Sequence, residues 1–315
     1  MRINGRYKAK GSRSKEKMMK KLVSLVFLMI VSTWSVTVDA QIKVVTTYPY
    51  IGDLTQKIGG EKVDVFVLGK GTEDPHFIVP KPSFIAKLRG ADLLIINGAD
   101  LETGFVPILI QQANNPRIQS FKGFLDLSQQ IKLINVPVQV SRSEGDIHPE
   151  GNPHFALDPH RIPILAKAIK EKLCGLDSNN CRTYEKGAGD FQKHWEEKTK
   201  EWDQKLSALK GTRVIQYHQL FNYFIAAYQL SVIGTIEPKP GIPATARHID
   251  ELIGTVKTQK GAFIFQDVYH ERKSARFIAE KTNIRDILLP HDVGAVPEAK
   301  DLFSLFDEIV RRLTD

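Results

Sequence analysis

Several histidines lie at or beside the ends of predicted β-strands, where an imidazole ring can bind a transition metal. The four strongest candidates are His76, His154, His218 and His291. His218 directly follows the predicted strand 214–217, and His291 comes after the predicted strand 286–289. Parallel α/β sheets bind ligands beyond the carboxyl ends of their strands, so we expect these rings to converge. Three or four imidazoles, with or without a carboxylate, satisfy the tetrahedral preference of Zn²⁺.

Two more histidines lie near the predicted site. His270 follows the predicted strand 262–266 and is the reserve ligand. His148 lies in the acidic loop 145–149, where we expect a solvated residue; transient collection of metal is the alternative. A single histidine is more often a capping or core residue than a metal ligand, so the prediction depends on the shared strand-end position.

Signatures of the common hydrolases and nucleotide-binding enzymes are missing from the sequence. It contains no His-Glu-x-x-His pair, no Gly-x-Ser-x-Gly elbow, no phosphate-binding loop and no dinucleotide fingerprint. A catalytic metal needs an open coordination position and a base within reach, whereas four protein ligands close the site. The pattern therefore favours a metal carrier over an enzyme. The alternative is a periplasmic zinc hydrolase with Glu73 as its general base.

Short runs of β-branched and other apolar residues alternate with amphipathic stretches along the chain. The predicted strands are 42–47, 63–68, 91–96, 214–217, 231–236, 262–266 and 286–289. Nearly continuous apolar strands separated by helices are typical of parallel sheets that are covered on both faces. The sequence thus predicts an α/β fold with two doubly wound parallel-sheet lobes.

One stretch, from about 183 to 209, interrupts this alternation because it has no strand pattern. Its apolar residues recur at helical spacing and are Tyr184, Ala188, Phe191, Trp195, Trp202 and Leu206. We expect one long rigid helix over 181–209 that joins an N-terminal lobe, 41–180, to a C-terminal lobe, 210–315.

The first forty residues have the pattern of a secretory signal peptide. Lys20 and Lys21 precede the apolar run 22–31, and small or apolar residues lead to Ala40. Residues 1–17 are a possible upstream extension, and a single membrane anchor is the alternative for the segment. No cysteine lies near the predicted cleavage point. We therefore expect a soluble periplasmic protein and not a lipoprotein.

The net charge of +8 is concentrated in this leader. Residues 1–40 contain nine Lys or Arg and two Asp or Glu, whereas 41–315 contain 35 basic and 34 acidic residues. A nearly neutral body gives no electrostatic basis for binding nucleic acid or an anionic lipid surface, so we expect neither partner.

Cys174 and Cys181 are the only two cysteines, and they flank the polar loop 175–180. Two cysteines are too few for a thiolate zinc cluster or a disulfide scaffold. In an oxidising compartment a local disulfide between them is the favoured state, and two unpaired thiols are the alternative.

Several motifs along the chain carry a resemblance to a known family. They are Asp74-Pro75-His76, Gly98-Ala99-Asp100-Leu101-Glu102, the stretch Asn-Pro-His-Phe-Ala-Leu-Asp-Pro at 152–159 and the stretch 217–224. The sequence resembles the periplasmic metal-binding receptors of ATP-binding-cassette importers that carry zinc or manganese, over essentially all of 41–315. The resemblance implies two α/β lobes, a rigid connecting helix and one metal at their interface. It also implies delivery of the metal to a membrane permease with its ATPase.

The fourth ligand departs from the pattern that the resemblance implies. Members of this family commonly have an aspartate after the last strand, whereas this sequence has His291 followed by Asp292. We expect His291 as the fourth ligand and Asp292 as a reserve. Zinc-binding members often carry a long loop rich in histidine and aspartate between the first two ligand histidines, and only Asp146 and His148 remain here.

The leading prediction is a monomeric periplasmic receptor for a divalent transition metal, with Zn²⁺ as the transported ion. The predicted ligands are rich in nitrogen, and Mn²⁺ favours oxygen donors. A Mn²⁺ receptor and a metal-dependent adhesin with the same fold are alternatives, as is a receptor for a metal chelate or another small solute.

Overall fold

The computed structural model describes residues 17–20, 40–138 and 148–315. The chain divides into two compact units, residues 1–40 and 41–315. Residues 17–20 are helical, and most of the predicted signal peptide lies outside the described residues, so it stays a prediction. Within the described ranges, no helix has both the length and the apolar character needed to cross a bilayer.

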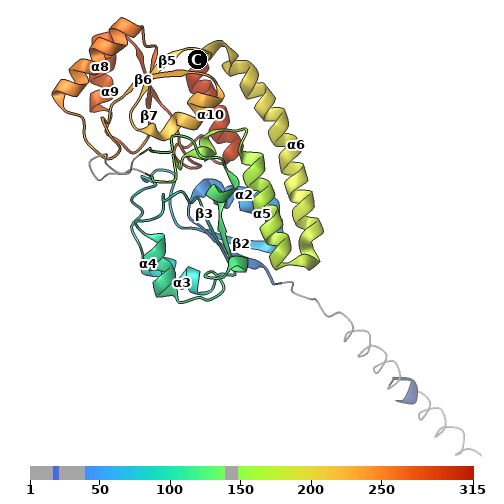
Figure 1. Cartoon of the computed structure of the whole chain (residues 1–315). Coiled ribbons are helices and arrows are strands. Elements are labelled where there is room, and N and C mark those ends of the chain that lie inside the picture. The colour runs from blue at the N-terminus through green and yellow to red at the C-terminus, as the bar shows by residue number, and fades with distance from the viewer. Residues whose placement is uncertain (1–16, 21–39, 139–147) are drawn as a thin grey trace, which may run out of the picture. The chain divides into compact units, whose positions relative to one another are not determined.

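The first sheet of the unit 41–315 has four parallel strands in the order β2-β1-β3-β4. They are β1 (Ile42–Thr46), β2 (Val63–Val67), β3 (Leu93–Ile96) and β4 (Phe124–Asp126). Successive side chains point to opposite faces of a sheet, and the neighbours Val44 and Val45 are both buried. Both faces of this sheet are therefore covered. The covering helices are α2 (Pro49–Gly59), α3 (Pro82–Arg89), α4 (Val106–Ala113) and α5 (Ile162–Leu176) (Figure 1).

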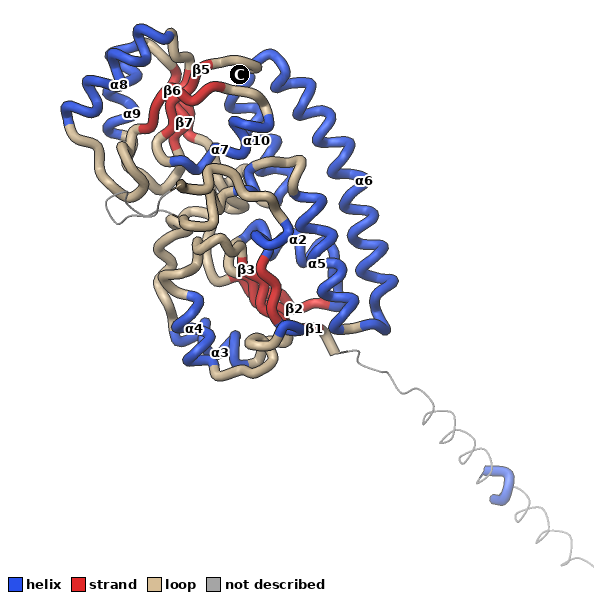
Figure 2. Tube along the Cα trace, viewed as in Figure 1, coloured by secondary structure: helices blue, strands red, loops and turns tan. Residues whose placement is uncertain are grey.

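The second sheet repeats this arrangement with parallel strands in the order β6-β5-β7-β8. They are β5 (Arg213–Gln216), β6 (Ser231–Thr235), β7 (Phe263–Gln266) and β8 (Arg285–Leu288). Its helices are α7 (Asn222–Ala227), α8 (Ala246–Gln259), α9 (Lys273–Thr282) and α10 (Leu302–Thr314). Figure 2 shows the two sets of strands surrounded by helices, which confirms the predicted fold class. Only β4 is new, because three residues give no periodicity to recognise.

A single long helix, α6 (Cys181–Leu206), runs alongside both lobes (Figure 1) and confirms the predicted connecting helix. It packs against α2, α5 and α10. Trp195 Nε1 donates to the carbonyl of Pro159 at 2.8 Å, and Trp202 Nε1 donates to Asp307 on α10 at 2.8 Å. A side chain at Gly187 would place Cβ 2.4 Å from the carbonyl oxygen of Ile58, so glycine permits the close approach of α6 to α2.

The predicted disulfide is confirmed. Cys174 and Cys181 are bonded with an S–S distance of 2.03 Å, and the bond joins α5 to the first residue of α6. The division of the chain at residues 180 and 210 stays a prediction.

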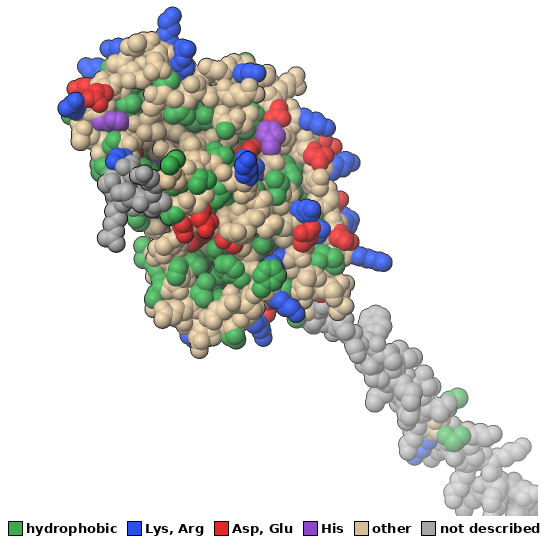
Figure 3. Space-filling model, viewed as in Figure 1, with side chains coloured by type: hydrophobic (Ala, Val, Ile, Leu, Met, Phe, Trp, Pro, Cys, Tyr) green, Lys and Arg blue, Asp and Glu red, His purple; other side chains and the backbone are tan. Residues whose placement is uncertain are grey.

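The charged side chains are spread out in keeping with the nearly neutral composition of the body. On the face that Figure 3 shows, Lys and Arg side chains and Asp and Glu side chains are scattered among uncharged ones. Interspersed charges of both signs keep the surface potential low.

Candidate metal centre

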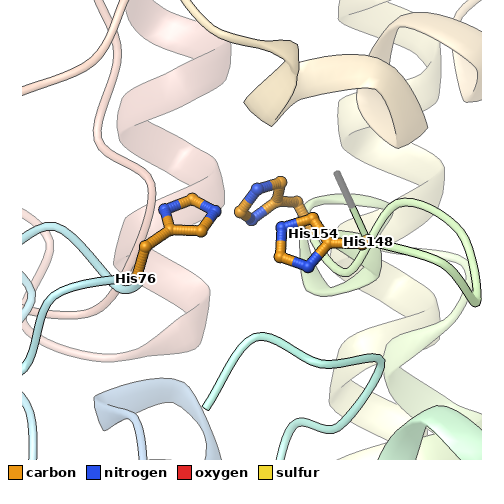
Figure 4. A group of neighbouring side chains, drawn as sticks. All are labelled: His76, His148 and His154. Carbon is orange, nitrogen blue, oxygen red and sulfur yellow. The ribbon is translucent and has the colours of Figure 1, made fainter. Parts of the chain in front are cut away.

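Four histidine rings gather at one place in the unit 41–315. The ligand atoms of His76, His148 and His154 all lie within 4.8 Å of one another, and they are the group that the described residues offer to a metal. The ring centroid of His218 is 5.3 Å from that of His76 and 5.6 Å from that of His154. Figure 4 shows the ring of His76 facing the rings of His148 and His154 from a different loop. Three of the four predicted ligands thus come together.

The inward nitrogens of this cluster have no protein partner. Nε2 of His76, of His148 and of His154 is buried, and none of them makes a hydrogen bond to the described residues. A buried polar atom left unpaired costs about 1–3 kcal/mol. Three such atoms in one place indicate a site built to bind an electrophile such as a metal ion.

The surroundings keep two of these rings neutral. Burial lowers the pKa of His154 well below its usual value, and the nearby rings of His76 and His218 add to this effect. Burial, again with His76 and His218, lowers the pKa of His148 to about 3. A neutral imidazole is the form that coordinates a metal, so both rings are ready to bind at neutral pH.

Asp74 orients the ring of His76. Its Oδ1 accepts hydrogen bonds from His76 Nδ1 at 2.7 Å and from the His76 backbone N–H at 3.0 Å. Burial by itself would raise the pKa of Asp74, but the bonds from His76 outweigh it and lower that pKa. With Nδ1 donating to the carboxylate, the lone pair of His76 lies on Nε2, which faces the cluster.

Glu237 does the same for His218. Its Oε2 accepts from His218 Nδ1 at 2.8 Å, and both side chains are 8% exposed. Burial would raise the pKa of Glu237, but hydrogen bonds from His218 and His270 overcome it and bring the pKa to about 2. The carboxylate therefore stays ionised and holds the proton of His218 on Nδ1, which leaves Nε2 for a metal.

We expect Glu237→Ala to weaken zinc binding by about 10–100-fold, the range found when the partner of a metal-bound histidine is removed. Glu237→Gln should have a smaller effect, since its amide oxygen can still accept from Nδ1 but lacks the charge. Competition with a fluorescent zinc chelator measures both affinities.

Glu308→Gln is the matched control, because Glu308 is another buried carboxylate and pairs with Arg311 and Arg312 far along the chain on α10. It should lower thermal stability and leave zinc affinity as in the wild type. A Glu237→Ala variant with unchanged zinc affinity would show that the bond to His218 is only structural.

His291 lies beside the cluster, but it is not among the three rings whose nitrogens meet in the described part of the chain. With Asp292 and His154 it lines a small cavity of about 30 Å³. Its ring lies edge-on to Tyr269, with centroids 5.0 Å apart, and its Nδ1 is buried without a hydrogen bond to the described residues. Burial lowers the pKa of His291 to about 4. Its role as fourth ligand stays a prediction.

Asp292, the reserve ligand, is engaged by backbone groups. Its Oδ1 accepts from the N–H of Tyr50 at 2.8 Å and from the N–H of Val293 at 2.6 Å. Tyr50 lies in the first turn of α2, where unpaired N–H groups favour a carboxylate. Burial raises the pKa of Asp292 to about 8, although these two hydrogen bonds act in the opposite direction. This geometry favours a role in holding the loop after β8 against α2.

His270, the other reserve, points both ring nitrogens at carboxylates. Nδ1 lies 2.9 Å from Asp267 Oδ2, and Nε2 lies 3.4 Å from Glu237 Oε1. Burial would lower the pKa of His270, but these two carboxylates outweigh it and raise the pKa to about 9. A protonated ring has no lone pair for a metal. The structure therefore makes His270 a partner of Glu237.

His148 is the residue whose place sequence reasoning missed, because a polar loop was expected to keep it in solvent. The backbone N–H of Gly151 donates to the carbonyl of His148 at 3.1 Å, and Gly151 has φ of 121°. His-Pro-Glu-Gly is thus a tight turn, with Pro at its second and Gly at its fourth position. That turn, visible in the sequence, brings His148 back toward His154.

Glu73, the general base of the alternative zinc hydrolase, already has partners in its own loop. Glu73 Oε2 accepts from the backbone N–H of Lys70 at 3.1 Å, and Glu73 Oε1 lies 4.0 Å from Lys70 Nζ. The Glu73 carboxylate therefore stabilises the turn at 70–73. The group of described residues that could hold a metal consists of histidines and contains no carboxylate.

Comparison with known proteins identifies relatives that match most of this chain. The chain is 26% identical over 250 residues to the manganese ABC transporter substrate-binding lipoprotein PsaA of Streptococcus anginosus, covering 79% of each protein. It is 25% identical over 254 residues to the zinc-binding lipoprotein AdcA of Streptococcus pneumoniae, covering 80% of this chain and 50% of that protein. Both relatives are named lipoproteins, whereas the two cysteines of this sequence are bonded to each other. That this chain has no lipid-bearing cysteine stays a prediction, and in this respect it would differ from these two relatives.

A solved structure and a family profile point to the same kind of protein as these two relatives. A crystal structure of ZnuA superimposes with a TM-score of 0.73 and 25% identity, covering 88% of this chain and 98% of that one. Residues 44–315 match the sequence profile of the family described as zinc-uptake complex component A, periplasmic. The chain is therefore an extracytoplasmic, metal-binding substrate-binding protein of an ATP-binding-cassette importer and not an enzyme, and it belongs to the zinc-uptake complex component A family.

Proposed function

We infer that this protein is the zinc receptor of its importer. It captures Zn²⁺ as cargo with His76, His154 and His218, and it hands the ion to a membrane permease driven by an ATPase. The observation that carries this inference is that Nε2 of His76 and of His154 is buried without a partner among the described residues, beside the ring of His218, whose centroid lies 5.3 Å and 5.6 Å from theirs. It acts in the periplasm, to which the predicted signal peptide at 1–40 would direct it, and it acts there as a monomer.

The choice of zinc follows from the type of ligand atom. Imidazole nitrogen suits zinc and copper, whereas manganese favours carboxylate, carbonyl and water oxygens. The carboxylates nearest the cluster, Asp74 and Glu237, accept hydrogen bonds from the outer nitrogens of the rings. A manganese receptor is the second candidate, because the relative PsaA is named for manganese.

We expect zinc to bind more tightly than manganese, as the order of stability of divalent complexes also requires. Protein stripped of metal should retain zinc, measured by elemental analysis after dialysis, when both ions are present at equal concentration. The control is the same mixture with Cu²⁺, which the same order places above zinc. Displacement of zinc by an equal concentration of manganese would contradict the assignment.

A further inference from the structure

We propose that His148 supplies the fourth nitrogen to the zinc ion held by His76, His154 and His218. The proposal rests on the proposed function, since it assumes that those three rings bind the metal. It replaces a ligand after the last strand with one from the turn just before His154. His291 then lies outside the coordination sphere.

The first argument is distance. The ligand atoms of His76, His148 and His154 lie within 4.8 Å of one another. The ring of His148 is tilted by 30° to that of His76 with centroids 5.3 Å apart, and its centroid is 6.3 Å from that of His154. Ligand nitrogens of a tetrahedral zinc site lie about 3.3 Å apart, given Zn–N bonds of about 2.0 Å. Small rotations of these rings therefore suffice to close the group around one ion.

The second argument is the direction of the His148 ring. Nε2 is buried without a hydrogen bond to the described residues, while the ring makes a hydrogen bond to the backbone of Ala99. Ala99 has φ of 52°, in the turn that follows β3. A hydrogen bond from the outer nitrogen to a backbone carbonyl is the usual support of a metal-bound histidine. His148 has the same arrangement as His76 with Asp74 and His218 with Glu237.

The third argument is that the same short segment holds two of the rings. The turn at 148–151 leads directly into Asn152, whose Oδ1 accepts from the N–H of His154 at 2.9 Å. Asn152 Nδ2 donates to the carbonyl of Gln219 at 2.7 Å, next to His218. One asparagine thus links the segment that carries His148 and His154 to the loop that carries His218.

The fourth argument concerns the residues that would otherwise complete the site. Asp292 Oδ1 already accepts two backbone N–H groups. His291 Nδ1 is buried without a hydrogen bond to the described residues, but its ring packs edge-on against Tyr269, with centroids 5.0 Å apart. The ring of His148 instead lies 5.3 Å from that of His76, and its ligand atom lies within 4.8 Å of those of His76 and His154, which favours His148 for the fourth position.

Cadmium-113 NMR on protein labelled with ¹⁵N-histidine tests the assignment directly, because a metal–nitrogen bond gives a scalar coupling. The probe is ¹¹³Cd²⁺ alone, bound to the metal-free full mature protein. We expect couplings to four histidines, namely His76, His148, His154 and His218. His148→Ala should remove one coupling, keep the other three and weaken zinc binding by about 10-fold or more.

His291→Ala is the matched variant and should keep all four couplings and the wild-type zinc affinity. Couplings to His76, His154 and His218 without one to His148 would overturn this proposal and leave the proposed function intact. Loss of a coupling in His291→Ala would also overturn it. Couplings to none of these rings would overturn the proposed function itself. Circular dichroism of each variant confirms that the fold is retained.

Discussion

Replacing His154 with alanine should abolish high-affinity zinc binding while the protein stays folded. The ring is buried within the cluster, and its Nε2 has no hydrogen bond to the described residues. Removing the partner of a ligand costs about 10–100-fold in metal affinity, so removing a ligand itself should exceed about 100-fold. His76→Ala should have the same result. Titration calorimetry and chelator competition cover the range of affinities.

The matched control is His194→Ala, which removes an exposed histidine that stacks on Phe303 of α10. Zinc affinity should be unchanged in that variant. If both His76→Ala and His154→Ala bound zinc as the wild type does, the assigned site would be wrong.

The metal-free His154→Ala variant should gain stability relative to the wild type as the pH falls below 6.5. The pKa of His154 is lowered well below its usual value by burial, so between 6.5 and that lowered value the unfolded chain binds a proton that the native ring does not. Stability of the wild type is therefore lost as the pH falls, by about 1.4 kcal/mol per pH unit from this ring. Alanine removes this loss.

The pH dependence must be compared between variant and wild type, because other buried groups change the stability with pH in the opposite direction. The pKa of Asp292 is raised to about 8 and that of Glu102 to about 7, both chiefly by burial. Each native carboxyl binds a proton that the unfolded chain lacks, which stabilises the native state as the pH falls. These contributions cancel in the difference. Urea denaturation in the presence of a chelator, at pH 7, 6 and 5, measures the difference in unfolding free energy between variant and wild type. If this difference did not change with pH, His154 would not be held neutral in the native state.

The fold could be predicted because its determinants are local. Strands and helices alternate in a pattern of apolar residues that can be counted along the chain, and the helix α6 is one stripe of aromatic residues from Tyr184 to Leu206. The disulfide could be predicted because Cys174 and Cys181 are close in sequence and flank a turn. The strand-end rule also selected His76, His154 and His218, which gather in the structure.

The tertiary structure alone decided which groups surround those rings. Glu237 meets His218 because parallel strands β5 and β6 end side by side, and Asp292 meets the start of α2 across 242 residues of sequence. His148 enters the cluster through a turn whose direction depends on the loops packed against it. Residue type and periodicity determine local conformation and burial, whereas contacts between distant loops depend on how the sheets pack. The sequence by itself therefore determined the fold class, the disulfide and three histidines of the cluster, and the packing of the loops decided that His148 lies beside them and which carboxylates hold the rings.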